Sequence, residues 1–334
     1  MTESPSTETR SVQLGGGLPA VFPLALGCMG MSGMYGASSE EESIRTIHTA
    51  LERGITLFDT GDFYGQGDNE MLLGRALRGR RDHALLSVKF GAMRGPDGTW
   101  LGFDARPVAV KNFCAYSLKR LGVDYIDIYR PSRLDPNVPI EDTIGAIMDL
   151  VKAGYVRAIG LSEVGPRTIR RAHATHPIAD LQIEYSLVSR KPEQEIFPLL
   201  HELGIGVTAY GLLSRGLLTG SKPTGKGDLR AHLPRFQGEN AEKNSALVQA
   251  LERMARARET SPAALAIAWA LAKQSHLVAV AGARTLAQLD AALAAVSLKL
   301  TAAEIEELER AVPASAVAGD RYQSQQMAHL DSER

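Results

Sequence analysis

The sequence predicts an α/β fold in which eight parallel strands and their connecting helices close into a (β/α)8 TIM barrel. Short apolar runs alternate with longer amphipathic segments, which is typical of a parallel sheet with crossover helices. Eight such runs occur, the number that this barrel needs. None is followed by the three-glycine fingerprint of an open dinucleotide-binding sheet, since Gly65-Gln66-Gly67 lacks the third glycine. Closure into a barrel is therefore favoured over an open sheet.

The individual elements follow from the spacing of apolar residues. The expected strands are residues 24–27, 56–58, 85–88, 125–129, 158–161, 181–184, 206–209 and 277–281. Helical patterns lie between them, for example at 40–52, 107–121, 140–152 and 192–203. Ser39 followed by Glu42 is typical of a helix N-terminus, because the serine oxygen can accept a hydrogen bond from a backbone amide of the first turn.

The ends and loops of the predicted barrel have their own signals. Residues 12–22, with three consecutive glycines as a turn, are expected to form an N-terminal hairpin that caps one end of the barrel, and residues 1–11 a flexible tail. Two stretches that follow strands, 91–106 and 211–242, have the composition of long loops. Such loops form the C-terminal face, where barrel active sites lie. No linker divides the chain, so residues 12–334 are expected to be one domain.

Composition narrows the class of partner. The formal net charge of -1 argues against nucleic acid or an anionic membrane surface, either of which favours a basic face. Small molecules are the expected partners. Cys28 and Cys114 are the two cysteines of the sequence, too few for a disulfide framework or a metal site of paired cysteines. With no signal peptide or long apolar run in the sequence, a cytoplasmic protein is expected.

Three ionisable side chains are expected to meet at the C-terminal face. Asp59 ends the second strand and Lys89 the third, while Tyr64 lies just beyond the second. Neighbouring strands are about 5 Å apart, so Asp59 and Lys89 can form a buried pair within reach of Tyr64. Spacing alone leaves two readings open. The trio is either a proton-transfer site or a structural ion pair beside a loop aromatic.

Reduction of a carbonyl compound would explain why Asp59, Tyr64 and Lys89 lie together. A hydride that reaches the carbonyl carbon leaves an oxyanion, which must receive a proton. Tyr64 can donate that proton, and a nearby Lys89 would lower the pKa of the phenol and ease its release. Asp59 would keep Lys89 charged, because a buried ammonium is costly unless it is paired.

A long motif resembles that of a known family. Phe-Asp-Thr-Gly-Asp-Phe-Tyr-Gly-Gln-Gly-Asp-Asn-Glu at 58–70 and Leu-Gly-Arg-Ala-Leu at 73–77 resemble the signature of the aldo-keto reductase superfamily. The similarity covers the chain from about residue 12 and continues through 88–91, 117–127, 160–162, 182–186, 216–220 and 319–322. It points to a bacterial-type NADPH-dependent oxidoreductase. The resemblance implies reversible reduction of an aldehyde or ketone to an alcohol with a nicotinamide coenzyme.

The resemblance also implies a catalytic tetrad of Asp, Tyr, Lys and His. Asp59, Tyr64 and Lys89 match its first three members, but Ser132 stands where the histidine is usual. A serine hydroxyl can donate a hydrogen bond to a carbonyl but cannot titrate near neutral pH. Ser132 is thus either a carbonyl-orienting group or a space-filling residue. Some relatives that lack the histidine act on pyridoxal, which suggests pyridoxal-like aldehydes as substrates.

The resemblance places the coenzyme across several loops of the barrel mouth. Gly27, Cys28 and Met29 would support the nicotinamide ribose, while Ser162 and Gln182 would bind the carboxamide. Tyr210 would stack on the nicotinamide ring. The loop over the pyrophosphate would be formed by Gly211, Leu212, Ser214, Arg215 and Leu217. Glu163 departs from the usual asparagine, and its role stays open.

The adenosine end of the coenzyme corresponds to residues 282–288. This segment opens the last helix in the sequence interpretation, and Gly282, Arg284 and Gln288 would clamp the adenosine 2′-phosphate. NADPH is therefore expected in preference to NADH. Ala292 replaces an asparagine that often binds adenine in the family, and Arg284 can alternatively be a surface arginine that caps a helix.

Other interpretations concern the substrate pocket and the class of function. The expected pocket walls are Trp100, Met31, Tyr35, Tyr129 and Arg130, with a pairing of Arg130 to Asp135 as the alternative. His232 is expected in a loop near the site and His329 in a solvated tail.

A slow NADP-binding sensor on the same barrel is one alternative function. A lyase or isomerase that uses Lys89 as a Schiff-base amine is another.

Overall fold

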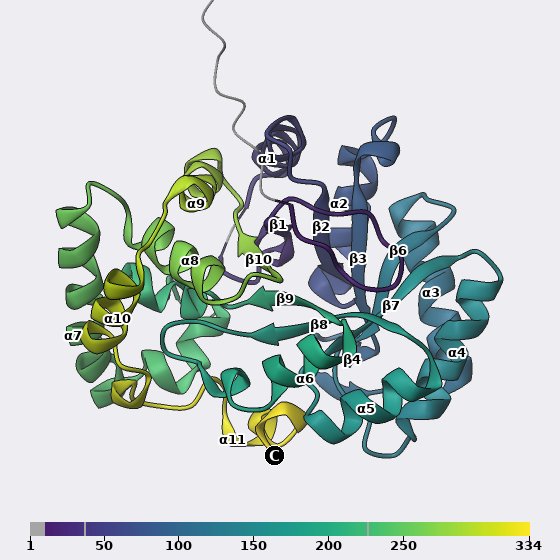
Figure 1. Cartoon of the computed structure of the whole chain (residues 1–334). Helices are drawn as coiled ribbons and strands as arrows, with labels where there is room; N and C mark the ends of the chain where they lie inside the picture. Colours follow the sequence, from purple (N-terminus) through teal and green to yellow (C-terminus); the bar gives the residue numbers. More distant parts are fainter. Residues whose placement is uncertain (1–10, 37, 226) are drawn as a thin grey trace, which may run out of the picture.

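Eight parallel strands form a closed barrel in the computed structural model, which describes residues 11–36, 38–225 and 227–334 (Figure 1). The predicted flexible tail therefore lies outside the described residues, apart from Ser11. The barrel strands are β1 (Leu24–Gly27), β2 (Leu57–Gly61), β3 (Leu85–Phe90), β6 (Ile126–Pro131), β7 (Val156–Ser162), β8 (Ile178–Glu184), β9 (Gly206–Tyr210) and β10 (Leu277–Gly282). Their order around the barrel follows the chain, and β1 closes it by pairing with both β2 and β10. The predicted fold is confirmed.

Each predicted strand is present, and several extend further than their apolar runs. Parallel pairing carries β2 as far as Gly61, which lies opposite Lys89 of β3. In the same way β3 pairs with β6 as far as Phe90 and Pro131. The extension is possible because a ladder of backbone hydrogen bonds does not require apolar side chains. Asp59 and Lys89 therefore lie within rigid strands and not in loops.

Helices surround the barrel, and most of them bury apolar side chains against it (Figure 1). They are α1 (Glu40–Glu52), α2 (Asp68–Ala76), α3 (Pro107–Leu121), α4 (Ile140–Lys152), α5 (Pro166–Thr175), α6 (Ile196–Leu203), α7 (Gly238–Ala257), α8 (Pro262–Lys273), α9 (Leu286–Ser297), α10 (Ala302–Ala311) and α11 (Ser324–Met327). The side chain of Ser39 accepts a hydrogen bond from the amide of Glu42, as the sequence predicts for α1. In the described part of the chain, no helix combines the length and apolar character that crossing a membrane requires.

Two expectations about loops and one about the last helix were wrong. Residues 91–106 contain an antiparallel hairpin of β4 (Ala92–Arg94) and β5 (Trp100–Phe103), which turns back on itself around Gly95 and Gly98. The predicted loop 211–242 ends early, because α7 already begins at Gly238. Helix α9 begins at Leu286 with Thr285 as its N-cap, and it is followed by α10 and α11, so it is not the last helix.

The segment before β1 closes the N-terminal end of the barrel. Val12 and Val21 form a single antiparallel bridge in place of the two full strands of a hairpin. Leu14 belongs to a buried apolar cluster with barrel residues such as Ala158 and Ile128. A Cβ atom at Gly206 would collide with the side chain of Leu14, so the absence of a side chain at this glycine leaves room for Leu14. The predicted capping is confirmed, and access to the interior is left to the opposite face.

A charged layer fills the middle of the barrel. Arg130 donates to both carboxylate oxygens of Asp180, at 3.0 and 2.9 Å, and to the hydroxyl of Thr208 at 3.1 Å. Both charged side chains are fully buried. Arg130 therefore neither pairs with Asp135 nor lines a substrate pocket, contrary to both expectations, because its strand position points it to the barrel axis.

Candidate active site

Asp59 and Lys89 form a buried ion pair at the C-terminal end of the barrel. The Nζ of Lys89 lies 2.5 Å from Oδ1 of Asp59, and both side chains are almost inaccessible to solvent. Gln182 of β8 completes a triangle, since its Oε1 accepts from Lys89 at 2.9 Å and its Nε2 donates to Asp59 at 2.7 Å. The hydroxyl of Ser87 also donates to Asp59. These bonds satisfy the buried charges and fix the position of the ammonium.

Tyr64 lies beside this pair, as expected. The ammonium of Lys89 lies 5.2 Å from the centre of its ring, and Phe63 packs edge-on against it. Burial raises the pKa of Tyr64 well above its ordinary value, and the charge of Asp59 raises it further. The expected lowering by Lys89 is therefore wrong for this geometry. Tyr64 holds its proton, which is the state that a proton donor requires.

Ser132 follows β6 and is buried, but its side chain does not line the cavity of the site. Its amide donates to the carbonyl of Phe90, and its hydroxyl has no hydrogen-bond partner in the structure. The next residue, Arg133, lines the cavity instead. Sequence reasoning missed Arg133, although it immediately follows the residue in the histidine position.

The triangle and Tyr64 lie in a cavity of about 630 Å³ at the barrel mouth. Many residues assigned to the coenzyme by resemblance line it: Gly27, Met29, Asp59, Ser162, Gln182, Tyr210, Gly211, Leu212, Arg215, Gly282, Arg284 and Gln288. The hydroxyl of Ser162 is buried and has no hydrogen-bond partner in the structure. An unpartnered donor of this kind is costly unless a ligand meets it. The residues present therefore fit a polar coenzyme extended over the barrel mouth.

Three other residues assigned to the coenzyme do not line this cavity. Cys28 is buried and directs its thiol toward the carbonyl of Leu26 at 3.6 Å. Ser214 accepts a hydrogen bond from Arg235 at 2.9 Å, and Leu217 is buried. All three side chains are buried in the protein and do not face the cavity.

Arg284 lines the cavity and contacts the loop after β1. Its guanidinium donates to the carbonyl oxygens of Tyr35 and Gly36, at 3.0 and 3.2 Å. The side chain of Gln288 accepts a hydrogen bond from the amide of Arg284. The start of α9, which follows β10, is thus connected to the loop after the neighbouring strand β1.

Glu163 holds the C-terminal segment against the barrel. This buried carboxylate accepts hydrogen bonds from Tyr210 at 2.7 Å, from Ser332 at 2.6 Å, and from Arg321 through both oxygens. Burial alone would raise the pKa of Glu163, but Arg321 and its other donors hold that pKa well below the ordinary range. Its backbone has a φ of 53°, which is uncommon for a residue other than glycine. The open role of Glu163 is thus structural.

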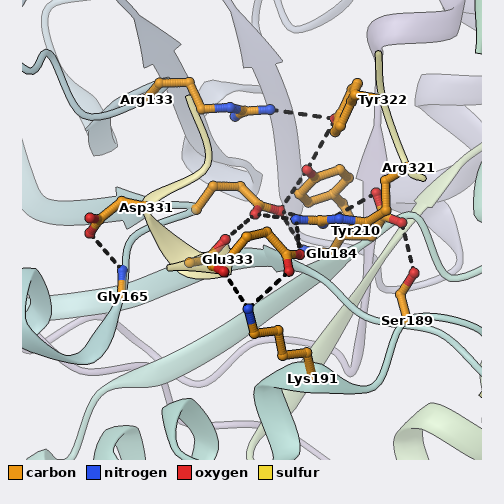
Figure 2. Close-up of polar contacts among 12 residues, drawn as sticks. Arg133, Gly165, Glu184, Ser189, Lys191, Tyr210, Arg321, Tyr322, Asp331 and Glu333 are labelled. Carbon is orange, nitrogen blue, oxygen red and sulfur yellow. Dashed lines mark hydrogen bonds and ion pairs between the residues drawn. The ribbon is translucent and has the colours of Figure 1, made fainter. Parts of the chain in front are cut away.

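Figure 2 shows how further residues of the C-terminal segment are attached. Arg321 lies 3.4 Å from Glu184 and 2.7 Å from Glu333. Lys191 contacts both the backbone and the side chain of Glu333, and the amide of Gly165 donates to Asp331. Burial disfavours the ionised form of Glu184, but the charges of Arg215, Arg321 and Arg235 lower its pKa below the ordinary value. The attachment is therefore an ion-pair network with two buried carboxylates at its centre.

This segment brings three more side chains to the cavity: Tyr322, Gln326 and His329. The hydroxyl of Tyr322 lies 3.3 Å from that of Tyr210, and the guanidinium of Arg215 lies over its ring. His329 packs edge-on against Phe103 of β5 at 5.3 Å, so the expectation of a solvated His329 was wrong. A polar tail carries no periodic signal, and so sequence reasoning could not place it. His232, by contrast, does not line the cavity.

Of the expected pocket walls, Trp100 and Tyr35 line the cavity. Tyr129 does not, because it is fully buried and stacks on Phe90 with ring centres 4.3 Å apart. Met31 is also buried away from the cavity. The wall also includes Phe63, which precedes Tyr64, and Phe103, whose ring packs edge-on against Trp100.

Comparisons with known proteins identify the family. Residues 23–313 match the model of the Aldo/keto reductase family. The chain belongs to this family. Probable aldo-keto reductase 1 of Glycine max is 43% identical over 311 residues, which cover 90% of this chain and 88% of that protein. The expected superfamily is thereby confirmed, and the chain is an aldo-keto reductase enzyme.

Solved structures of aldo-keto reductases share the barrel. A glycerol dehydrogenase from Gluconobacter oxydans has a TM-score of 0.81 and 30% identity, covering 92% of this chain and 97% of that one. An aldo-keto reductase from Bacillus halodurans in its holo form has a TM-score of 0.76 and 30% identity, with the same coverage. One from Klebsiella pneumoniae, in complex with NADPH, has a TM-score of 0.73 and 25% identity, covering 91% of this chain and 95% of that one.

Proposed function

We propose that this aldo-keto reductase uses NADPH to reduce an aldehyde or ketone to an alcohol, with Tyr64 as the proton donor. The observation that carries the proposal is the arrangement of Tyr64 beside the Asp59–Lys89–Gln182 triangle at one end of the cavity. The bound coenzyme would supply the hydride, and solved relatives include one in complex with NADPH. Pyridoxal-like aldehydes are among the proposed substrates.

The protein side of the reaction follows from the geometry. Tyr64 donates its proton to the oxyanion that forms on the substrate, and the rigid ion pair beneath it keeps a cation close to that developing charge. Ser162 and Gln182 would orient the carboxamide, and the ring of Tyr210 would support the nicotinamide. Arg284 would pair with the 2′-phosphate, which is the reason to expect NADPH in preference to NADH.

Tyr64→Phe tests the proposal. The variant keeps the ring but lacks the transferable proton, so we expect NADPH oxidation with carbonyl compounds to fall by about 100-fold or more. NADPH binding, measured by fluorescence quenching, should stay intact. Retained turnover would contradict the assigned role of Tyr64.

A panel of carbonyl compounds, including pyridoxal, should be run with both NADPH and NADH. Turnover of at least one compound, with NADPH favoured, is the expected result. Tight NADPH binding without turnover of any compound would instead support the sensor hypothesis. Borohydride trapping tests the Schiff-base hypothesis, and we expect no adduct at Lys89 because Asp59 holds its ammonium.

A further inference from the structure

The charge of the cavity lining is strongly unbalanced. Its cationic side chains are Arg94, Arg133, Arg215, Arg230, Arg284 and Lys89. Among the described residues that line it, Asp59 is the sole carboxylate. An NADPH molecule is itself anionic and accounts for part of this excess. The question is whether the excess at the catalytic end serves the coenzyme or the substrate.

Three of these six cations have a carboxylate partner among the described residues. Lys89 is held by Asp59, Arg215 by Glu184 at 2.8 Å, and Arg230 by Asp228 at 2.6 Å. Arg133 differs from these three, as does the exposed Arg94, which donates to the carbonyl of Gly98 at 3.2 Å. Within the described parts of the chain Arg133 forms no ion pair, and its guanidinium donates to two neutral oxygens, the carbonyl of Ser132 and the hydroxyl of Tyr322 at 3.4 Å. Glu163 acts on it electrostatically, but Arg321 already occupies both oxygens of that carboxylate.

Arg133 lies at the catalytic end of the cavity. It follows β6 by two residues, next to the strand that carries Lys89, and its guanidinium points toward Tyr322 (Figure 2). Its charge opposes the rise in the pKa of Tyr64 and adds to the lowering of the pKa of Lys89, as expected of a cation near both groups. Arg284, by contrast, is connected to the carbonyl oxygens of Tyr35 and Gly36 in the loop after β1.

We infer that Arg133 binds an anionic group of the substrate, so that the preferred substrates are aldehydes or ketones that carry a carboxylate or phosphate. The planar fork of an arginine matches both anions through paired hydrogen bonds. Arg133 is half-buried and has no carboxylate partner among the described residues, and such an anion provides one. Phe63, Trp100 and Phe103 supply apolar walls for the rest of the molecule. This inference rests on the proposed function.

Three probes that share one aromatic aldehyde core test the inference: 4-carboxybenzaldehyde, 4-formylphenyl phosphate and the neutral methyl 4-formylbenzoate. We expect at least one anionic probe to exceed the ester in kcat/KM by about 10- to 100-fold, the range for a charge-assisted hydrogen bond. The two anions separate carboxylate from phosphate recognition. Equal kcat/KM for all three in the wild type would overturn the inference.

Arg133→Gln should reduce the preference for the anionic probe by about 10-fold or more, mainly through KM. Arg133→Lys should retain part of it, because the charge remains while the fork is lost. Arg157→Gln is the matched control, since Arg157 is an exposed arginine at the other end of the barrel. A fall in kcat that is equal for all three probes would mean that Arg133 acts on the carbonyl, and would overturn the inference.

A binding measurement separates this inference from the proposed function. Calorimetry with the NADPH-loaded protein should detect benzoate more tightly than benzamide, and Arg133→Gln should abolish that difference. Equal binding of the two compounds to the wild type would contradict the role of Arg133 whatever the turnover. Absence of NADPH oxidation with every probe and with the wider panel would instead count against the proposed function. The two failures are therefore distinguishable.

Discussion

The guanidinium of Arg321 donates to both carboxylate oxygens of Glu163, at 3.1 and 2.9 Å, across 158 positions of sequence. Both side chains are buried, and Glu163 directly follows the last residue of β7. A pair of this kind is strongly destabilised when one partner is removed, because the other charge is left buried. The contact therefore connects the stability of the barrel mouth to the position of the C-terminal segment.

Glu163→Gln is expected to lower the free energy of unfolding by about 3 kcal/mol at neutral pH. The low pKa of Glu163 means that its contribution is present above the ordinary carboxyl pKa and is lost as pH falls below it. The difference between variant and wild type should accordingly shrink below about pH 4. Denaturant unfolding across this range measures it. Glu141→Gln, which breaks the exposed pair with Arg171, is the control and should show a much smaller loss.

Deletion of residues 331–334 should weaken substrate binding more than coenzyme binding. It removes the contacts of Asp331 with Gly165, of Ser332 with Glu163, and of Glu333 with Arg321. Tyr322 and His329 would then lose their fixed positions on the cavity wall. We expect the KM for the carbonyl substrate to rise by about 10-fold, equivalent to one or two hydrogen bonds. An unchanged KM would show that the segment is held without these contacts. Glu306→Gln on the exposed face of α10 is the control.

A double-mutant cycle separates the structural and catalytic roles of the Asp59–Lys89 pair. Lys89→Met should cost about 3–5 kcal/mol of stability, because it leaves the carboxylate of Asp59 buried without its cation. Adding Asp59→Asn should restore a large part of that loss but none of the turnover. Unfolding experiments and NADPH oxidation, measured on all four proteins, provide the cycle. Recovery of turnover in the double variant would mean that the pair is only structural.

Asp62 should make the protein less stable as pH rises. Burial, together with the charge of Glu70, raises the pKa of Asp62 to about 7. The folded state therefore holds a proton that the unfolded state has lost, and stability falls between the ordinary carboxyl pKa near 4 and about pH 7. Asp62→Asn can still accept the hydrogen bond from the amide of Gly91.

The Asp62→Asn variant should be more stable than the wild type by up to about 4 kcal/mol at pH 8, at about 1.4 kcal/mol per pKa unit. Near pH 4 the two proteins should differ little, because the carboxyl is then largely protonated in both states. Thermal unfolding from about pH 4 to pH 8 checks the trend. A gap that stays constant with pH would show that Asp62 does not titrate in this range.

The barrel was predictable because its signal is repetitive. Each strand is an apolar run, and Asp59 and Lys89 are conspicuous as charges at the ends of such runs. The position of Arg133 was not predictable, because which of two adjacent residues reaches a cavity depends on backbone direction after the strand. Nor was that of His329, since the tail is placed by ion pairs such as Arg321–Glu163 that join distant positions.

The pKa of Tyr64 was mispredicted for a related reason. Sequence spacing put a cation near the phenol, but it carried no information on how deeply the ring is buried or how near Asp59 lies. Burial outweighs a single neighbouring charge when that charge is already neutralised by an ion pair. Most residues assigned to the coenzyme do line the cavity, because the carboxyl ends of the barrel strands all lie on the same side.

The edge-to-face contact between Phe103 and His329 joins two segments that are independent of the eight-stranded ladder. One is a hairpin inserted after β3 and the other is the end of the chain. The residues that form the cavity entrance and the residues that hold the barrel together therefore lie in different parts of the sequence. Substitutions at these two rings can change which molecules enter while the ladder stays intact, so substrate range is free to diverge faster than the fold.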